Sequence, residues 1–173
     1  MPVNYEFKAR VRDIEDKEKQ LLALNPHFAG EDNQRDTYYN VAQGRLKLRE
    51  GNIENALIYY ERHDVAGAKI SDVLLYEHRP DKDLKAILEK LHGIKVVVDK
   101  KRRIYFLDNV KFHFDRVESL GSFIEVEAID KTGTAPHETI KQQCDKYAAF
   151  FQIREEDYVS QSYSDLLLNQ TST

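Results

Sequence analysis

The first segment of the chain alternates between apolar and polar residues. Every second residue from Val3 to Val11 is apolar, and the residues between them, up to Arg12, are polar. Successive side chains of a strand point to opposite faces of a sheet, so a period of two predicts a strand with one apolar and one polar face. Asp13 suits the N-cap of a following helix, which Asn25-Pro26 ends after about three turns.

Apolar patterns in the rest of the chain predict a sheet interrupted by helices. From residue 31 to residue 76, Tyr, Val, Ile and Leu recur between turns that contain glycine, which indicates several strands joined by hairpins. Further strands are expected at 95–106, 109–118 and 122–129, and helices between Pro80-Asp81 and Gly93, from Thr134-Pro136, and at 162–168. The predicted fold class is α+β with about eight strands, mostly antiparallel, in a single domain over 1–170 with a frayed end at 171–173.

The composition of the chain excludes several classes of protein. Its 173 residues, 41% of them hydrophobic, are enough for one ordinary core. The 26 Lys and Arg residues against 30 Asp and Glu residues give a net charge of -4, which argues against binding nucleic acid through overall charge. The lone Cys144 excludes an intramolecular disulfide and a cysteine-based zinc site. Since the sequence has neither a membrane-spanning apolar run nor a signal peptide, we expect a soluble, cytoplasmic protein without a membrane partner.

The polar faces of the predicted strands carry an unusual amount of charge. Like charges on neighbouring strands repel one another across a solvated face, and a bound polyanion would relieve that repulsion. An ordinary antiparallel sheet with a solvated polar face is the alternative. The charges that share a strand face are Glu6, Lys8 and Arg10; Arg45, Lys47 and Arg49; Arg62; Lys100 and Arg102; and Glu125 and Glu127.

A barrel would turn these charged faces inward. The lower effective dielectric of a barrel interior strengthens the attraction between cations and a bound anion, and it makes each unpaired charge more costly. Guanidinium groups can hold the nonbridging oxygens of a triphosphate in pairs, while lysine acts as a point charge. Glu6, Glu125 and Glu127 would repel phosphate unless a hard cation lay between them, which indicates Mg2+ or Mn2+.

The chain resembles the CYTH superfamily, the triphosphate tunnel metalloenzymes, over almost its whole length. The resemblance rests on residues 4–10, 44–50 and 121–127, together with Lys100 and Arg102. Segments 120–123 and 162–167 are most similar to the class IV adenylyl cyclase branch, and the other relatives include thiamine triphosphatase and inorganic triphosphatase. The resemblance implies an eight-stranded antiparallel β-barrel with helices packed outside, a tunnel that holds the triphosphate, and one or two divalent metals bound by glutamates.

The resemblance also implies roles for individual residues. Glu6 and Lys8 match the last two places of the family's Glu-x-Glu-x-Lys signature, and Asn4 stands where its first glutamate would be, so the implied metal site is less anionic. His113 shares a strand face with Asp115 and can reach the same interior. The implied substrate-binding residues are Lys8, Arg10, Arg45, Lys47, Arg49, Arg62, Lys100 and Arg102; the metal ligands are Glu6, Asp115, Glu125 and Glu127; and the catalytic residues are Lys8, Arg49 and Glu127.

The sequence leaves three functions open. A cyclase would convert ATP to cyclic AMP and pyrophosphate by attack of the 3′-hydroxyl on the α-phosphorus, and the branch resemblance favours it. A triphosphatase would direct water at the terminal phosphorus of inorganic triphosphate, thiamine triphosphate or a nucleoside triphosphate. A noncatalytic module would bind a polyphosphate or a nucleotide through the same cations, and Asn4 is the residue that favours it. A homodimer is compatible with each of the three.

Overall fold

The structure is a computed structural model that describes residues 3–65 and 68–171, except for the side chains of Val3 and of residues 62–72. The strands and helices occur in the predicted order, and a short 3-10 turn at Glu155–Asp157 is added to them. Within this description, none of the helices has the length and apolar character needed to cross a membrane. The elements are β1 (Val3–Arg10), α1 (Ile14–Leu22), β2 (His27–Tyr39), β3 (Arg45–Glu50), β4 (Ala56–Val65), β5 (Ala68–Glu77), α2 (Lys82–His92), β6 (Ile94–Leu107), β7 (Val110–Val117), β8 (Gly121–Asp130), α3 (His137–Phe150) and α4 (Tyr163–Thr171).

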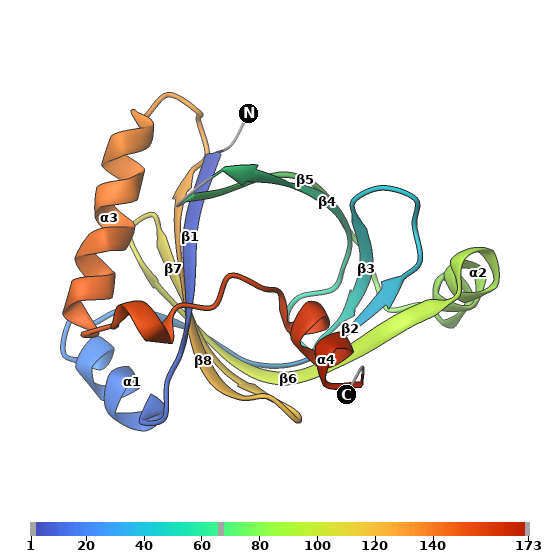
Figure 1. Cartoon of the computed structure of the whole chain (residues 1–173), viewed down its shortest axis with the longest axis horizontal. Coiled ribbons are helices and arrows are strands. Elements are labelled where there is room, and N and C mark those ends of the chain that lie inside the picture. Colours follow the sequence, from blue (N-terminus) through green and yellow to red (C-terminus); the bar gives the residue numbers. More distant parts are fainter. Residues whose placement is uncertain (1–2, 66–67, 172–173) are drawn as a thin grey trace.

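The eight strands form one antiparallel sheet, as the resemblance implied, in the order β1-β8-β7-β6-β2-β3-β4-β5. The sheet curls until its edge strands, β1 and β5, contact each other, so that the strands form a ring (Figure 1). In β2, the ladder with β6 shifts register between Phe28 and Gly30, and Gly30 has a φ of 130°. Such a bulge bends a strand and increases its twist. The curvature turns one face of every strand toward the centre of the ring.

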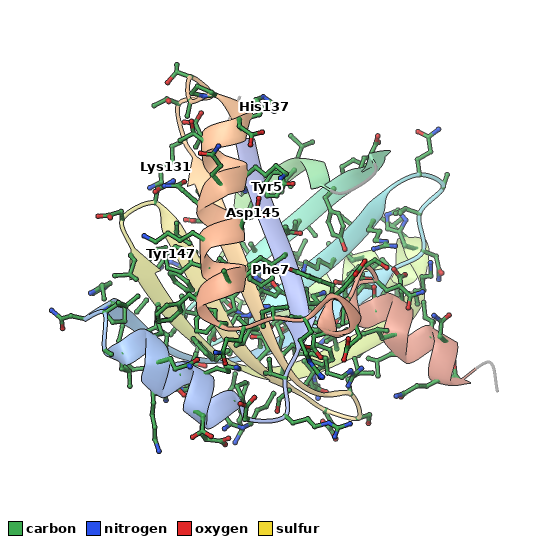
Figure 2. The ribbon with its side chains drawn as sticks, turned by 60° about the vertical axis from the view of Figure 1, so that its left-hand side comes forward. Tyr5, Phe7, Lys131, His137, Asp145 and Tyr147 are labelled. Carbon is green, nitrogen blue, oxygen red and sulfur yellow. The ribbon has the colours of Figure 1, made fainter. Side chains whose placement is uncertain are left out.

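Two helices cover the convex face of β1, β7 and β8. Figure 2 shows α3 alongside β1, with Tyr5 and Phe7 on the side of the strand that faces the helix. The rings of Phe112 in β7 and Tyr147 in α3 lie 4.7 Å apart and nearly perpendicular, an arrangement that aromatic pairs favour. Cys144 of α3 is buried in the same cluster. The convex side therefore holds the main apolar core, to which α1 contributes as well.

Helix α4 differs from the expectation that the helices pack outside the barrel. Its first residue, Tyr163, is buried among inward-facing apolar side chains, including Tyr38, Val98 and Phe123. Figure 1 shows α4 inside the curve of the sheet, above β2 and β6. Charged residues occupy the middle of the concave face, but this end of the face is apolar. Covering it with a helix removes apolar surface from water and so stabilises the fold. The helix thus closes one end of the ring.

A pair of helical leucines tests the packing of α1 on the sheet. Leu21 of α1 is 0% exposed, whereas Leu91 of α2 is 71% exposed. Leu21→Ala is expected to lower the free energy of unfolding by roughly 2–5 kcal/mol, because it removes buried methyl groups and leaves a cavity. Leu91→Ala is expected to change it by less than about 0.5 kcal/mol. Urea unfolding followed by circular dichroism measures both values, and equal losses would contradict this packing.

Candidate active site

A cavity of about 670 Å³ lies within the ring, lined by the concave faces of the strands and by the start of α4. This volume is in the range of small-molecule binding sites, roughly 300–1,000 Å³. Eight of the predicted metal ligands and substrate-binding cations line this cavity, and they come from four strands. They are Glu6, Lys8, Lys47, Arg49, Lys100, Arg102, Glu125 and Glu127.

Three of the predicted cations meet at one carboxylate that the sequence analysis did not select, Asp36 of β2. Its Oδ2 accepts hydrogen bonds from Lys47 Nζ at 3.1 Å and from Lys100 Nζ at 2.9 Å. Arg49 binds both carboxylate oxygens at 2.9 Å. Burial opposes ionisation of Asp36, but the charges of Arg49, Lys100 and Lys47 outweigh it and hold its pKa well below the ordinary value. The residue could have been found because it shares a strand face with Tyr38 and Gln34.

Arg102 of β6 forms an ion pair with Asp115, which lies directly opposite it on β7. The guanidinium donates to both oxygens of Asp115, at 2.7 and 2.6 Å, and the hydroxyl of Tyr163 donates to one of them at 2.7 Å. Asp115 is 0% exposed and is not among the residues that line the cavity. Because both of its oxygens are engaged by Arg102 and Tyr163, we propose that Asp115 positions Arg102 rather than binding metal as the resemblance implied.

Glu125 is directed toward positive charge. It lies 3.4 Å from the ammonium of Lys8 and 3.4 Å from the guanidinium of Arg102. Burial would raise its pKa, but these two cations hold the pKa well below the ordinary value. His113 Nδ1 lies 3.4 Å from the same carboxylate, and burial together with Arg102 lowers the pKa of His113 to about 4. His113 therefore lines the cavity as a neutral ring, in the interior where its strand face placed it.

Glu6 and Glu127 form a different pair of carboxylates. They are directly opposite each other on the paired strands β1 and β8, and both line the cavity. Burial and then the charge of Glu6 raise the pKa of Glu127 to about 7. The amide of Asn4 donates to Glu127 Oε1 at 2.7 Å, while its own Oδ1 is buried without a hydrogen-bond partner. Two carboxylates and an unsatisfied amide oxygen are a donor set that suits a hard divalent cation.

This donor set is smaller than the one implied by the resemblance. Among the residues described, no three His, Cys, Asp or Glu side chains gather closely enough to hold a metal ion by themselves. The other two predicted ligands are engaged by cations: Glu125 lies beside Lys8 and Arg102, and Asp115 is paired with Arg102. Asn4 in place of a glutamate removes a further carboxylate. The residues present fit a metal held by Glu6, Glu127 and the Asn4 oxygen.

Two predicted substrate-binding arginines, Arg10 and Arg45, are not among the described residues that line the cavity. Arg10 is exposed; it donates to the backbone oxygen of Leu120 at 2.5 Å and stacks on the ring of Phe123. Arg45 forms an ion pair of 2.8 Å with Asp165 and so ties β3 to α4. The side chain of Arg62 lies outside the described residues. Arg10 and Arg45 thus have the predicted strand parity but lie toward the end of the ring that α4 closes.

Besides Asp36, the charged residues of the cavity wall that the sequence did not predict include Lys111 and Glu54. Lys111 lies on the same face of β7 as His113 and could have been found by that parity. Glu54 follows β3 in a turn; it lies 3.0 Å from Arg49 and 2.7 Å from Lys111, and these cations outweigh burial and lower its pKa. The carboxylate of Asp32 fixes this turn by accepting hydrogen bonds from three successive backbone amides, those of residues 52–54. A contact made through a turn leaves no periodic signal in the sequence.

The wall formed by β4 and β5 differs from the charged walls. Most of its described inward residues are apolar, among them Ile58, Val73 and Leu75, and Glu77 at the end of β5 is the charged exception among them. Ile53 and Ile129 add to the apolar surface from neighbouring segments. Val73 and Leu75 are 47% and 57% exposed. The cavity therefore combines a wall that suits a polyanion with a wall that suits an organic group.

Comparison with known proteins identifies a matching family and similar solved structures. The model of the CYTH domain family matches residues 3–163. Among solved structures, the PH1012 protein from Pyrococcus horikoshii OT3 is 28% identical, with a TM-score of 0.83 over 94% of this chain and 98% of that one. A candidate adenylate cyclase from Vibrio parahaemolyticus is 18% identical, with a TM-score of 0.76 over 96% and 98% of the two chains. HpAC1 from Hippeastrum, a candidate adenylyl cyclase with a dominant triphosphatase activity, is 11% identical, with a TM-score of 0.68 over 98% and 96%. A search of curated proteins finds no match.

The raised pKa of Glu127 predicts a pH dependence of stability. Between the ordinary value of 4.5 and about 7, the folded protein holds a proton that the unfolded chain has released, so the free energy of unfolding falls as the pH rises. Glu127→Gln removes this contribution. Relative to the unmodified protein, the variant is expected to gain roughly 1–3 kcal/mol between pH 4.5 and pH 7.5. Chemical unfolding across this range measures the difference. Glu138→Gln, at an exposed position of α3, is the control, and parallel curves for all three proteins would contradict the assignment.

Proposed function

The chain belongs to the CYTH domain family, and from this membership we propose that it is a divalent-metal-dependent enzyme that acts on the triphosphate group of a nucleotide. The specific activity that we propose is that of a class IV adenylyl cyclase, which converts ATP to cyclic AMP and pyrophosphate. The observation that carries this choice is the pairing of a cationic wall with the apolar wall of β4 and β5 in one cavity. Inorganic triphosphate would leave the apolar wall unused, whereas a nucleotide uses both.

The cationic wall is suited to hold the triphosphate chain. Lys47, Arg49 and Lys100 converge from β3 and β6, and Lys8, Arg102 and Lys111 line the remaining charged wall. Each of these cations is paired with a carboxylate in the structure, and phosphate oxygens would share or replace those pairs. In the reaction, Lys8 and Arg49 would stabilise the charge that develops on the equatorial and leaving oxygens during in-line displacement.

Glu6, Glu127 and the Asn4 oxygen would hold the divalent cation. Mg2+ or Mn2+ supplies Lewis-acid polarisation of phosphate oxygens when bound. The chain's own contribution is to place two carboxylates on the wall next to Lys8, so that the negative metal ligands and the triphosphate-binding cations lie on adjoining parts of one surface.

A triphosphatase is the second candidate, and one observation favours it. HpAC1 from Hippeastrum, whose structure is similar, has a dominant triphosphatase activity. The same cations would serve hydrolysis, in which water attacks the terminal phosphorus.

Product analysis tests these candidates. Purified protein is incubated with ATP, inorganic triphosphate or thiamine triphosphate, each with Mg2+ or Mn2+, and the products are separated by chromatography. Cyclic AMP and pyrophosphate from ATP are the expected products. Orthophosphate would instead favour the triphosphatase. If each substrate were bound but left unchanged, the enzymatic proposal would fail and a noncatalytic binding module would remain.

Arg49→Ala and Lys8→Ala are expected to reduce kcat/KM for the active substrate by about tenfold or more, because each removes a charge-assisted contact with phosphate. Steady-state kinetics measures the change. Arg154→Ala is the matched control, since Arg154 is 68% exposed and pairs with Glu156 and Asp157 far from the cavity. Unchanged kinetics in both test variants would remove the cationic wall from the site.

Variants of Glu6 and Glu127 test whether these two residues bind the metal. Glu6→Gln and Glu127→Gln are expected to raise the Mn2+ concentration for half-maximal binding by about tenfold, because each removes a charged ligand. Asn4→Glu, which restores the first glutamate of the family signature, is expected to lower it. Electron paramagnetic resonance of free Mn2+ measures binding without a turnover assay, with Glu138→Gln as the control. Binding curves that superimpose would reject these ligands.

A further inference from the structure

The carboxylate of Asp36 is a meeting point for cations from two different strands. Lys47 and Arg49 reach it from β3, and Lys100 reaches it from β6, all at 2.9–3.1 Å. The side chains of Asp36 and Lys100 are each 1% exposed. A buried carboxylate with three such partners fixes the spacing of their charged groups, because moving any one of them breaks a charge-assisted hydrogen bond.

Lys100 is the cation that depends most on this contact. Arg49 and Lys47 of β3 and Arg102 of β6 lie near it, and the ring of Tyr163 from α4 is 6.0 Å from its ammonium. Burial and the three neighbouring cations lower the pKa of Lys100 to about 7, and the charge of Asp36 keeps it from falling further. Without Asp36, a buried amine among three cations would lose its proton at a lower pH.

We propose that Asp36 is a positioning residue for triphosphate binding, which holds Lys47, Arg49 and Lys100 at one point of the cavity wall and favours the charged form of the buried Lys100. This inference rests on the proposed function and extends it to a residue that need not touch substrate. A single carboxylate neutralises one of three charges, so the cluster keeps a net positive charge toward the cavity. In the opposite role, Asp36 would compete with phosphate for Lys47, Arg49 and Lys100 and would occupy these cations until phosphate displaced it.

The two roles predict opposite effects of Asp36→Asn on the binding of inorganic triphosphate, measured by calorimetry without metal. A competitor, once removed, leaves tighter binding at every pH. A positioning residue, once removed, leaves weaker binding. The loss increases from acidic pH up to about pH 7, because over this range Lys100 loses its proton in the variant before it does so in the unmodified protein. We expect a loss of about tenfold or more at pH 8 that shrinks toward equality at pH 5.5.

A second pair of variants assigns the effect to Lys100. In a Lys100→Met background, Asp36→Asn should no longer cause a loss that increases with pH, because the titrating amine is gone. Asp145→Asn, on the exposed side of α3, is the matched control and should bind as the unmodified protein does. Tighter binding in Asp36→Asn, or a loss that does not change with pH, would overturn the proposal.

Direct titration of Lys100 keeps the test independent of triphosphate binding. Nuclear magnetic resonance of protein labelled at lysine Cε should show one lysine that titrates near neutral pH, assigned by its absence in Lys100→Met. The titration should move to lower pH in Asp36→Asn. A Lys100 that stays charged through pH 9 in both proteins would overturn the proposal. If the unmodified protein bound no triphosphate, the proposed function would fail, while this titration would still decide what Asp36 does to Lys100.

Discussion

The structure depends on enclosing many charges within a ring of strands without leaving any buried charge uncompensated. A charge removed from water is costly unless a partner of opposite sign and further hydrogen bonds surround it. Asp36, Asp115 and Glu54 meet this requirement for the buried or half-buried cations of the cavity wall. Arg49 pairs with both Asp36 and Glu54, and Arg102 pairs with both Asp115 and Glu125, so these arginines link the ion pairs of the wall into networks.

The division between charge and apolar surface also organises the fold around the cavity. The convex face carries the main core under α1 and α3, so the concave face does not have to supply most of the apolar burial. Where the concave face does become apolar, α4 covers it, and Tyr163 connects that cover to the charged wall through its hydrogen bond to Asp115. Packing and electrostatics are joined at this one side chain, whose ring also lies 3.9 Å from the ammonium of Lys8.

The sequence predicts what is periodic and misses what is not. Alternation along β1, β3 and β8 was sufficient to place Glu6, Lys47 and Glu127 on the inner face, because side-chain parity in a strand is fixed by geometry. Parity does not tell how far along the axis a residue lies, which is why Arg10 and Arg45 were included although they lie near the end that α4 closes. Nor does it reveal partners that arrive from another strand or a turn, such as Glu54. The role of Asp115 depended on Arg102 lying directly across the ladder, a register that one strand's sequence does not contain.

The contact between β1 and β5 differs from every other junction in the ring. In the described part of the chain, the hydrogen-bonded order of strands begins at one of them and ends at the other. The circumference can therefore widen at this seam without breaking a backbone ladder, whereas widening elsewhere would break several hydrogen bonds together. Glu6 of β1, which we propose as a metal ligand, and the apolar residues of β5 lie on opposite sides of the seam. A wider ligand would thus be accommodated by separation of β1 from β5 at this seam, while the cationic wall of β2, β3 and β6 keeps its shape.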